Sequence, residues 1–350
     1  MVTLQDVARA AGVSIATASW AVNDNKNVRI PESTRRKVRK VAQELGYRQN
    51  AMARSLARGQ SDLIGFISDG VATSPFAGQV IQGAQDEAWR NGKILLVVDT
   101  NGDAGMERRA CSFMLERQVE GIAYSSWVHH AVRPPRDLDK VNSVLVNCFD
   151  SEGRFPAVVP DEVQGGRAAT DLLLQAGHRR ISFVNAVDSS PASQGRLQGY
   201  RDALAAAGVV YDPNLVIRCA ADQEGGYGVV EQVLSTGATA VFCHNDRTAM
   251  GLFDALRERG LHVPEDLSVV GFDNQEIISA HLHPALSTVG LPQYDLGVLG
   301  IRTLLERGGE EGADDAEDGG GSAPAYEPIR VTCPTVVRRS IRNLAPVSEV

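Results

Sequence analysis

The chain has few cysteines and no long apolar run. Its 350 residues include five cysteines, an odd number with no CxxC pair (Cys111, Cys148, Cys219, Cys243 and Cys333). This usage argues against a disulfide framework and predicts reduced core thiols in a cytosolic protein. The longest purely aliphatic stretch is Ile94–Val98, whereas a membrane helix needs roughly 18 apolar residues. The N-terminus, MVTLQDVARAAG, has neither the basic region nor the long apolar core of a secretion signal.

Signatures of catalysis are also missing. The sequence contains no GxSxG, no GxxxxGK[ST], no HExxH and no complete GxGxxG. His281 and His283 are separated by one residue, but no nearby cysteine or histidine would complete a zinc site. We therefore expect no metal, no cofactor and no enzymatic activity.

Charge is distributed unevenly along the chain. Residues 1–60 contain 11 Lys and Arg against 4 Asp and Glu, a balance of +7, and the remainder contains 24 against 39, a balance of −15; together they give the net charge of −8. A basic head on an acidic body suggests two domains with different partners, and phosphate is the natural partner of the head. A basic face that is merely solvated is the alternative.

The head reads as three short helices. Apolar residues recur at helical spacing in the first, Gly12 then permits a tight turn, and Ser14 can cap a second helix over residues 15–22. A third helix follows Pro31 and ends at Gly46, with one apolar face formed by Val38, Val41, Ala42 and Leu45. This is the helix-turn-helix arrangement, in which the second helix enters the major groove of DNA. A generic three-helix interaction domain is the alternative.

The residues of the head resemble those of the LacI (lactose-repressor) family in order and along its whole length. The matching positions are Thr3–Ala8, Ala11–Ser14, Thr17, Ser19, Asn23, Thr34, Arg35, Val38, Leu45–Tyr47, Asn50, Ala53, Arg54 and Leu56. The resemblance continues to about residue 340. It implies a transcriptional repressor that binds a palindromic DNA operator as a homodimer, with a tetramer as a further possibility, and that responds to a small molecule, usually a sugar.

The resemblance also assigns roles within the head. Ile15, Ala16 and Trp20 match the base-reading positions of the second helix, and Thr17 and Ser19 have hydroxyls suited to phosphate. Trp20 stands where the family usually has Arg, so we expect more apolar contact with thymine methyl groups than guanine recognition. Packing of Trp20 into the core of the head is the alternative. The full set of expected DNA contacts is Thr3, Ser14, Ile15, Ala16, Thr17, Ser19, Trp20, Asn23, Tyr47, Asn50, Ala53, Arg54 and Leu56.

Residues 48–60 match the hinge of the family, which folds into a short helix on DNA. Leu56 occupies the position of the leucine that paired hinge helices insert into the minor groove, where an apolar wedge kinks the duplex. Arg54 and Arg58 flank it and favour phosphates. Leu56 as an ordinary linker residue is the alternative.

The body alternates apolar, β-rich runs with helical stretches. Strands are predicted at residues 63–67, 94–98, 122–124, 144–148, 181–185, 240–243 and 268–272, and helices at 162–176, 197–207, 226–234 and 248–259. This alternation predicts an α/β fold with parallel sheets in two lobes, and ligands of such sheets bind at the carboxyl ends of strands. The resemblance makes the body a two-lobed, sugar-binding-protein-like fold in which the chain crosses between lobes near residues 160, 290 and 328.

Polar residues follow several predicted strands, and the resemblance makes five residues candidate effector contacts: Phe76, Asn147, Arg196, Asp246 and Asp273. Carboxylates and a guanidinium suit sugar hydroxyls, and an aromatic face suits the apolar side of a sugar ring. Structural alternatives exist for each. Asp246 could be a helix cap, Arg196 a buried ion pair, Phe76 a core residue and Asn147 a turn former. Ala221 stands where many relatives have a second stacking aromatic residue.

The expected organisation is therefore a helix-turn-helix head at 1–47, a hinge at 48–60, a two-lobed effector-binding and dimerisation domain at 61–340 and a tail at 341–350. Residues 308–322 contain six acidic residues and six glycines without a basic residue, which predicts a disordered surface loop. Three other classes remain open: an α/β enzyme with an accessory head, a secreted sugar-binding protein for transport, and a regulator whose partner is another protein.

Overall fold

The structure, a computed structural model, describes residues 2–23, 28–47, 61–74, 77–310 and 325–344. It divides into two compact units, Met1–Ser61 and Asp62–Val350. Four predicted features lie outside the described residues: the hinge at 48–60 with Asn50, Ala53, Arg54 and Leu56; Phe76; most of the acidic stretch at 308–322; and residues 345–350.

Three helices form the head: α1 (Leu4–Ala11), α2 (Ile15–Val22) and α3 (Glu32–Glu44). Thr3 and Asp6 form a reciprocal capping box at the start of α1, and Gly12, at a φ of 66°, ends it. Ser14 caps α2 by accepting a hydrogen bond from the backbone N–H of Thr17. Small and branched apolar side chains fill the core between the helices (Val7, Ala8, Ala11, Ala18, Ala21, Val38 and Ala42). The helix-turn-helix prediction is confirmed, including the bounds of α2.

The first lobe of the body contains a six-stranded parallel sheet in the order β11-β5-β4-β3-β1-β2. Helices α5 and α13 pack on one face of this sheet and α6 on the other, so the sheet is buried on both sides. The elements of this lobe are β1 (Leu63–Asp69), α5 (Gly78–Arg90), β2 (Ile94–Asp99), α6 (Ala104–Glu116), β3 (Gly121–Val132), a 3₁₀ turn (Arg136–Lys140), β4 (Ser143–Asp150), β5 (Ala157–Pro160), α13 (Gln293–Glu310) and β11 (Ile329–Val331).

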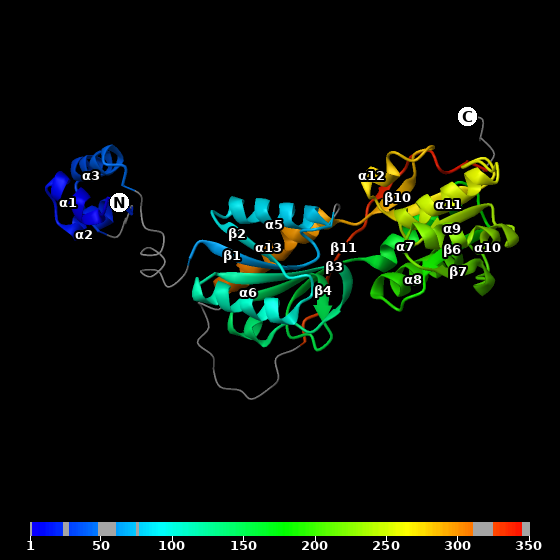
Figure 1. Cartoon of the computed structure of the whole chain (residues 1–350), viewed down its shortest axis with the longest axis horizontal. Helices are drawn as coiled ribbons and strands as arrows, with labels where there is room; N and C mark the ends of the chain where they lie inside the picture. Colours follow the sequence, from blue (N-terminus) through cyan, green and yellow to red (C-terminus); the bar gives the residue numbers. More distant parts are fainter. Residues whose placement is uncertain (1, 24–27, 48–60, 75–76, 311–324, 345–350) are drawn as a thin grey trace. The chain divides into compact units, whose positions relative to one another are not determined.

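The second lobe repeats the arrangement with the strand order β12-β10-β9-β8-β6-β7, in which only the edge strand β12 is antiparallel. Helices cover this sheet (Figure 1), and apolar clusters lie on both of its faces. Its elements are α7 (Glu162–Gln175), β6 (Ile181–Ala186), α8 (Pro191–Ala206), a 3₁₀ turn (Pro213–Leu215), β7 (Val216–Cys219), α9 (Gln223–Gly228), α10 (Val230–Ser235), β8 (Ala240–Cys243), α11 (Asp246–Glu258), β9 (Ser268–Asp273), α12 (Glu276–Ser279), β10 (Ser287–Gly290) and β12 (Thr335–Val336).

The chain crosses between the lobes three times. It leaves the first lobe after β5, returns after β10 and leaves again after β11, which matches the expected crossings near 160 and 290 and places the third just beyond 331.

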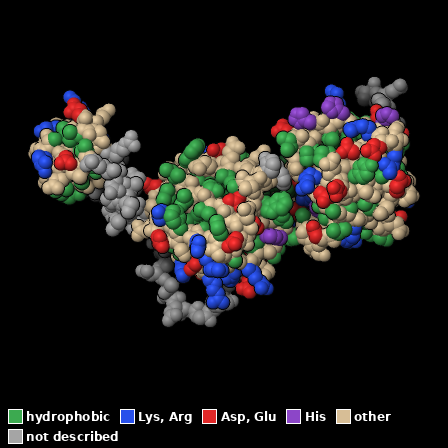
Figure 2. Space-filling view, viewed as in Figure 1, with side chains coloured by type: hydrophobic (Ala, Val, Ile, Leu, Met, Phe, Trp, Pro, Cys, Tyr) green, Lys and Arg blue, Asp and Glu red, His purple; other side chains and the backbone are tan. Residues whose placement is uncertain are grey.

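Figure 2 shows acidic and basic side chains interspersed over the second lobe. All five cysteines are buried and none forms a disulfide.

Three local predictions differ from the structure. The helix predicted at 226–234 is interrupted at Val229 into α9 and α10, and the helix predicted from 197 begins six residues earlier, at Pro191. Residues 341–344 belong to the second lobe rather than to a tail. The backbone N–H of Arg342 donates to Ser268 Oγ, and that of Leu344 donates to the carbonyl of Ala176.

Glycines allow α7 and α8 to pack at very short range. A Cβ atom at Gly199 would lie 2.1 Å from the carbonyl oxygen of Val163, and one at Gly166 would lie 2.4 Å from the carbonyl oxygen of Arg196. Real side-chain atoms do not approach backbone so closely, so only glycine permits this contact. The close packing brings the first turn of α7 beside the buried face of α8, where the site described below is built.

Gly199→Ala should therefore lower the free energy of unfolding by about 1–3 kcal/mol, because the added methyl group must push two helix backbones apart. Gly228→Ala is the matched control, since a Cβ there would meet no atom within 4 Å. Urea unfolding of both variants tests this expectation. Equal stability of the two variants would contradict it.

Candidate functional site

The second helix of the head presents three of the predicted base-reading residues to solvent. Ile15 and Trp20 are 50% and 38% exposed, and Ala16 is also exposed. Trp20 is not part of the apolar cluster of the head. Its alternative assignment as a core residue is therefore not supported, and α2 offers an apolar surface where hydrogen-bonding side chains are usual in DNA recognition.

Hydroxyl and amide groups around α2 are engaged with one another. Ser14 Oγ lies 2.8 Å from Thr17 Oγ1, and Asn23 Nδ2 donates to Ser19 Oγ at 3.1 Å. From α3, Arg39 Nε donates to the carbonyl oxygen of Ala21 at 3.1 Å. This contact of Arg39 helps to fix the orientation of α2, and the resemblance did not single it out.

In the body, a cavity of about 260 Å³ lies between the two lobes. Three of the predicted effector contacts line it together: Asn147 within β4, Arg196 on α8 and Asp273 at the end of β9. The other lining residues include Trp127, His129, Glu162, Asp188, His244, Asn245, Arg247 and Gln275. The structure thus brings together, between the two lobes, residues that are far apart in the sequence.

Arg196 is the centre of this site. Its side chain is 4% exposed, and its Nε donates to Glu162 Oε2 at 2.8 Å and its Nη1 to the carbonyl oxygen of His244 at 2.6 Å. A carboxylate oxygen of Asp273 lies 3.6 Å from Nη2, and the guanidinium carbon lies 3.6 Å from the centre of the Phe272 ring. Arg196 is therefore both a buried ion-pair residue and a wall of the cavity.

Burial and charge shift the pKa values of the groups around Arg196 in opposite directions. Although burial alone would raise the pKa of Glu162, the charge of Arg196 and the contact with His129 lower it to about 2. Burial raises the pKa of Asp273 to about 6, against the opposing charge of Arg196. Burial, together with the charge of Arg196, lowers the pKa of His244 to about 3. The site thus combines a firmly ionised carboxylate, a titratable carboxyl group and a neutral histidine.

Two of the cavity residues have unusual backbone conformations. Asn147 and Asp273 have φ values of 58° and 96°, in the region that residues with a side chain rarely adopt. Asn147 Nδ2 donates to the carbonyl oxygen of Ser126 at 2.9 Å, which holds its side chain beside β3. Strained conformations of this kind concentrate at functional sites. The turn-former alternative for Asn147 describes its backbone correctly, while its side chain still lines the cavity.

Asp246 does not line this cavity, so its prediction as an effector contact is corrected. Its side chain is fully buried and accepts hydrogen bonds from the backbone N–H of Gln275 at 2.7 Å and from Thr288 Oγ1 at 2.6 Å. The cap of α11 is Asn245, one residue earlier, and not Asp246. Burial raises the pKa of Asp246 well above its usual value, with a further contribution from the charge of Asp273. Its role in the fold is to join β9, β10 and α11.

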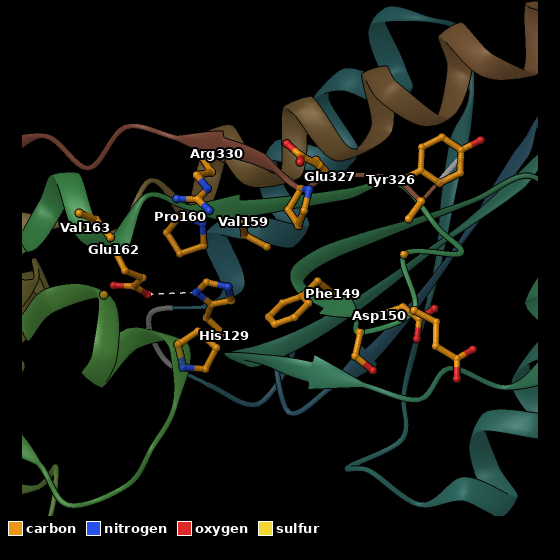
Figure 3. A pocket seen from close by; sticks show the side chains of 17 residues that line it. His129, Phe149, Asp150, Val159, Pro160, Glu162, Val163, Tyr326, Glu327 and Arg330 are labelled. Carbon is orange, nitrogen blue, oxygen red and sulfur yellow. Dashed lines mark hydrogen bonds and ion pairs between the residues drawn. The ribbon is translucent and has the colours of Figure 1, made fainter. Parts of the chain in front are cut away.

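A hydrogen bond between the lobes closes one side of the cavity. His129 Nδ1 of the first lobe lies 3.3 Å from Glu162 Oε1 of the second, and Figure 3 shows this contact beside a neighbouring cavity of about 520 Å³ that also contains Phe149 and Arg330. His129 and Glu162 line both cavities. Sequence reasoning missed this pair, because neither residue follows a predicted strand.

A β-bulge accounts for the position of His129. The pairing of β3 with β4 loses its register between Ser125 and His130, and bulges redirect the side chains within them. Trp127, His129 and Val128 all lie in this interval and all line the cavity. No signal in the sequence marks this bulge.

Within the described ranges, no group of three or more His, Cys, Asp or Glu side chains is arranged to hold a metal ion. Over the same residues, no helix is both long and apolar enough to cross a membrane.

Comparison with known proteins matches both parts of the chain. Residues 3–50 match the family "Bacterial regulatory proteins, lacI family", and residues 170–340 match "Periplasmic binding protein-like domain". The chain is 31% identical to the ribose operon repressor of Haemophilus influenzae over 88% of this chain and 92% of that protein. It is 32% identical to catabolite control protein A of Priestia megaterium over 90% and 95%.

The chain belongs to the LacI family. Among solved structures, it resembles the lac repressor dimer bound to operator and an anti-inducer, with 25% identity, a TM-score of 0.75 and coverage of 97% of this chain and 99% of that one. It also resembles a CelR–cellobiose complex, with 26% identity, a TM-score of 0.64 and coverage of 97% and 100%. The protein is thus a transcriptional repressor with a helix-turn-helix DNA-binding head.

The raised pKa of Asp273 predicts that the stability of the body depends on pH. The pKa of Asp273 rises from 3.8 to about 6 on folding, so its contribution to stability is fully present below pH 4 and is lost as the pH rises through about 6. A shift of about two units corresponds to ~3 kcal/mol. The charges of Arg196 and Arg247 lower the pKa of Asp273 and the charge of Glu162 raises it, but burial has the largest effect.

Asp273→Asn removes this titration. The free energy of unfolding of the variant relative to the parent protein should therefore increase between pH 4 and pH 7, as measured by urea unfolding across the range. A difference that stays flat across this range would show that the carboxyl group of Asp273 has an ordinary pKa.

Proposed function

We propose that this protein represses genes of carbohydrate utilisation by binding a palindromic operator as a homodimer, and that a sugar bound between its lobes changes operator affinity. One observation supports the effector site above all: Asn147, Arg196 and Asp273 converge on a single cavity that both lobes enclose. Only the fold brings these side chains together.

The chemistry of the cavity suits a sugar. A guanidinium, a carboxyl group and an amide offer donors and acceptors for vicinal hydroxyl groups. Relatives of this chain include repressors of ribose operons, and the similar CelR structure contains cellobiose. These similarities support a sugar as the effector of this chain.

The head provides the operator contacts. In this proposal, residues 1–47 bind the major groove through Ile15, Ala16 and Trp20, and residues 48–60 form the hinge with Leu56 as the minor-groove wedge. Thr3, Ser14, Thr17, Ser19, Asn23, Tyr47, Asn50, Ala53 and Arg54 complete the contact surface, mainly toward phosphates. Residues 61–340 form the effector-binding and dimerisation domain.

Coupling between the two ligands follows from linkage. A sugar that contacts both lobes favours one spacing of the lobes, and the operator favours one spacing of the hinges in the dimer. Each ligand must then change the affinity of the other by the same factor, typically equivalent to ~1–3 kcal/mol. The hydrogen bond between His129 and Glu162 lies in the path of such a movement, since it joins the lobes beside the cavity. An inducer and a corepressor differ only in which spacing they favour.

Operator selection tests the role of Trp20. Trp20→Arg should move the preferred half-site toward guanine, because Arg can donate two hydrogen bonds to its O6 and N7 and Trp only one. Selection from a randomised half-site library measures this preference. Trp89→Arg, an exchange of an exposed tryptophan outside the head, should leave the preference unchanged. An unchanged preference in Trp20→Arg would exclude base contact by Trp20.

Thermal unfolding against a panel of monosaccharides, disaccharides and sugar phosphates tests the effector site. A ligand at about 100 times its Kd should stabilise the protein by ~2.7 kcal/mol. Arg196→Ala and Asp273→Ala should lose this stabilisation while keeping operator binding, and Asp254→Asn should keep both. A panel without any stabilising sugar would redirect the proposal to a non-sugar metabolite or a partner protein, and retention of the response in both alanine variants would place the effector elsewhere.

A further inference from the structure

The effector cavity opens into a second compartment of about 560 Å³, roughly twice the volume of the inner one. Trp127, Arg247 and Gln275 line both, so the two compartments adjoin. The outer compartment is also enclosed by both lobes. Asp69, Gly70, Thr73, Ser74 and Asn101 come from the first lobe, and Met250, Ile277 and Ile278 come from the second.

An exposed tryptophan stands at the junction of the two compartments. Trp127 is 44% exposed although it belongs to a central strand of the sheet, because the bulge of β3 turns it out of the regular pairing. The backbone of Gly70 packs against the indole of Trp127. It has a φ of 70°, and a Cβ atom there would lie only 3.0 Å from Trp127 Cδ1. Part of the indole thus rests against backbone, and the remainder faces the cavity.

Polar side chains with free bonding capacity surround the indole. Within the described part of the chain, the side chains of Asp69, Asn101 and Arg247 make no hydrogen bond or ion pair. An apolar ligand that covered them would impose the cost of desolvating a carboxylate and a guanidinium without new partners. A ligand with hydroxyl groups around an apolar face would satisfy them and cover the indole at the same time.

A second pyranose ring has these properties, since its C–H groups form one apolar face and its hydroxyls project from the edge. The volume of the inner compartment, about 260 Å³, is below the range of roughly 300–1,000 Å³ usual for small-molecule sites. It suits a single ring held by Arg196, Asp273 and Asn147. The outer compartment adds room for another ring.

We propose that the effector is a disaccharide, with one ring in the inner compartment and the other stacked on Trp127 in the outer one. This inference rests on the proposed function, because it extends the same cavity. It also gives Trp127 the stacking role that Ala221 cannot provide. Ala221 lines the inner compartment, but its methyl group offers no aromatic face.

The test compares disaccharides with their own monosaccharides on the full-length protein. Isothermal titration with cellobiose, maltose and lactose, and with glucose and galactose, should find one disaccharide that binds at least about tenfold more tightly than either of its component sugars. Trp127→Ala should reduce that advantage to within about twofold, because the second ring of the disaccharide loses its stacking surface while the ring beside Arg196 keeps most of its contacts. Trp89→Ala, which removes another exposed tryptophan of the first lobe, should preserve the advantage.

Fluorescence provides an independent readout that does not depend on affinity. The chain has three tryptophans, so Trp20→Phe combined with Trp89→Phe leaves Trp127 as the only one. Saturation with the disaccharide should change its emission more than saturation with the monosaccharide, because only the disaccharide places a ring on the indole, and equal changes would contradict the stacking.

The possible results distinguish failure of the second compartment from failure of the sugar site itself. Equal binding of a disaccharide and its monosaccharide, or equal weakening of both by Trp127→Ala, would overturn the second compartment and leave the sugar site intact. Absence of binding by any of these sugars would overturn the inference and, with it, the assignment of the inner cavity to a sugar.

Discussion

The body of this protein depends on one buried guanidinium. Arg196 lies in the interior of the second lobe, and a charge removed from water is tolerated only when partners surround it. Glu162, Asp273 and the carbonyl oxygen of His244 supply those partners, and the Phe272 ring covers one face. Removing one member of such a group typically costs about 3–5 kcal/mol, because the remaining charge is left unpaired. The close glycine contacts between α7 and α8 bring Glu162 beside Arg196.

The same charge group connects the fold to its function. Glu162 pairs with Arg196 through one oxygen and approaches His129 of the other lobe through the second, so the interior of one lobe and the contact between the lobes share a residue. Asp273, at the end of β9, and Asn147, within β4, complete the cavity, and both have positive φ values. In the proposed function, a ligand that bonds to Arg196 and Asp273 competes with the pairing of Arg196 with Glu162, and Glu162 also contacts the other lobe through His129. That shared residue is the link we propose between the effector and the spacing of the lobes.

Local sequence signals predicted much of this structure. The capped helices of the head and the strand–helix alternation followed from periodicity and caps. The choice of Asn147, Arg196 and Asp273 as residues of one site followed from the family resemblance. Asp246 was misassigned because a position after a strand does not reveal whether a side chain turns toward the cavity or back to Thr288 and Gln275. Trp127, His129 and Glu162 were missed because a bulge in β3 and an approach between the lobes place them there, and both are tertiary effects with no local signature.

The proposed function requires that ligand binding at the Arg196 cavity and operator binding by the head are thermodynamically coupled. Coupling is measured as operator affinity with and without a saturating cavity ligand, and as ligand affinity with and without saturating operator, on the intact protein at one salt concentration. The two affinities should change by the same factor, on the order of 5- to 150-fold. A ligand that binds the cavity, loses its affinity in Asp273→Ala and yet leaves operator affinity unchanged would contradict it.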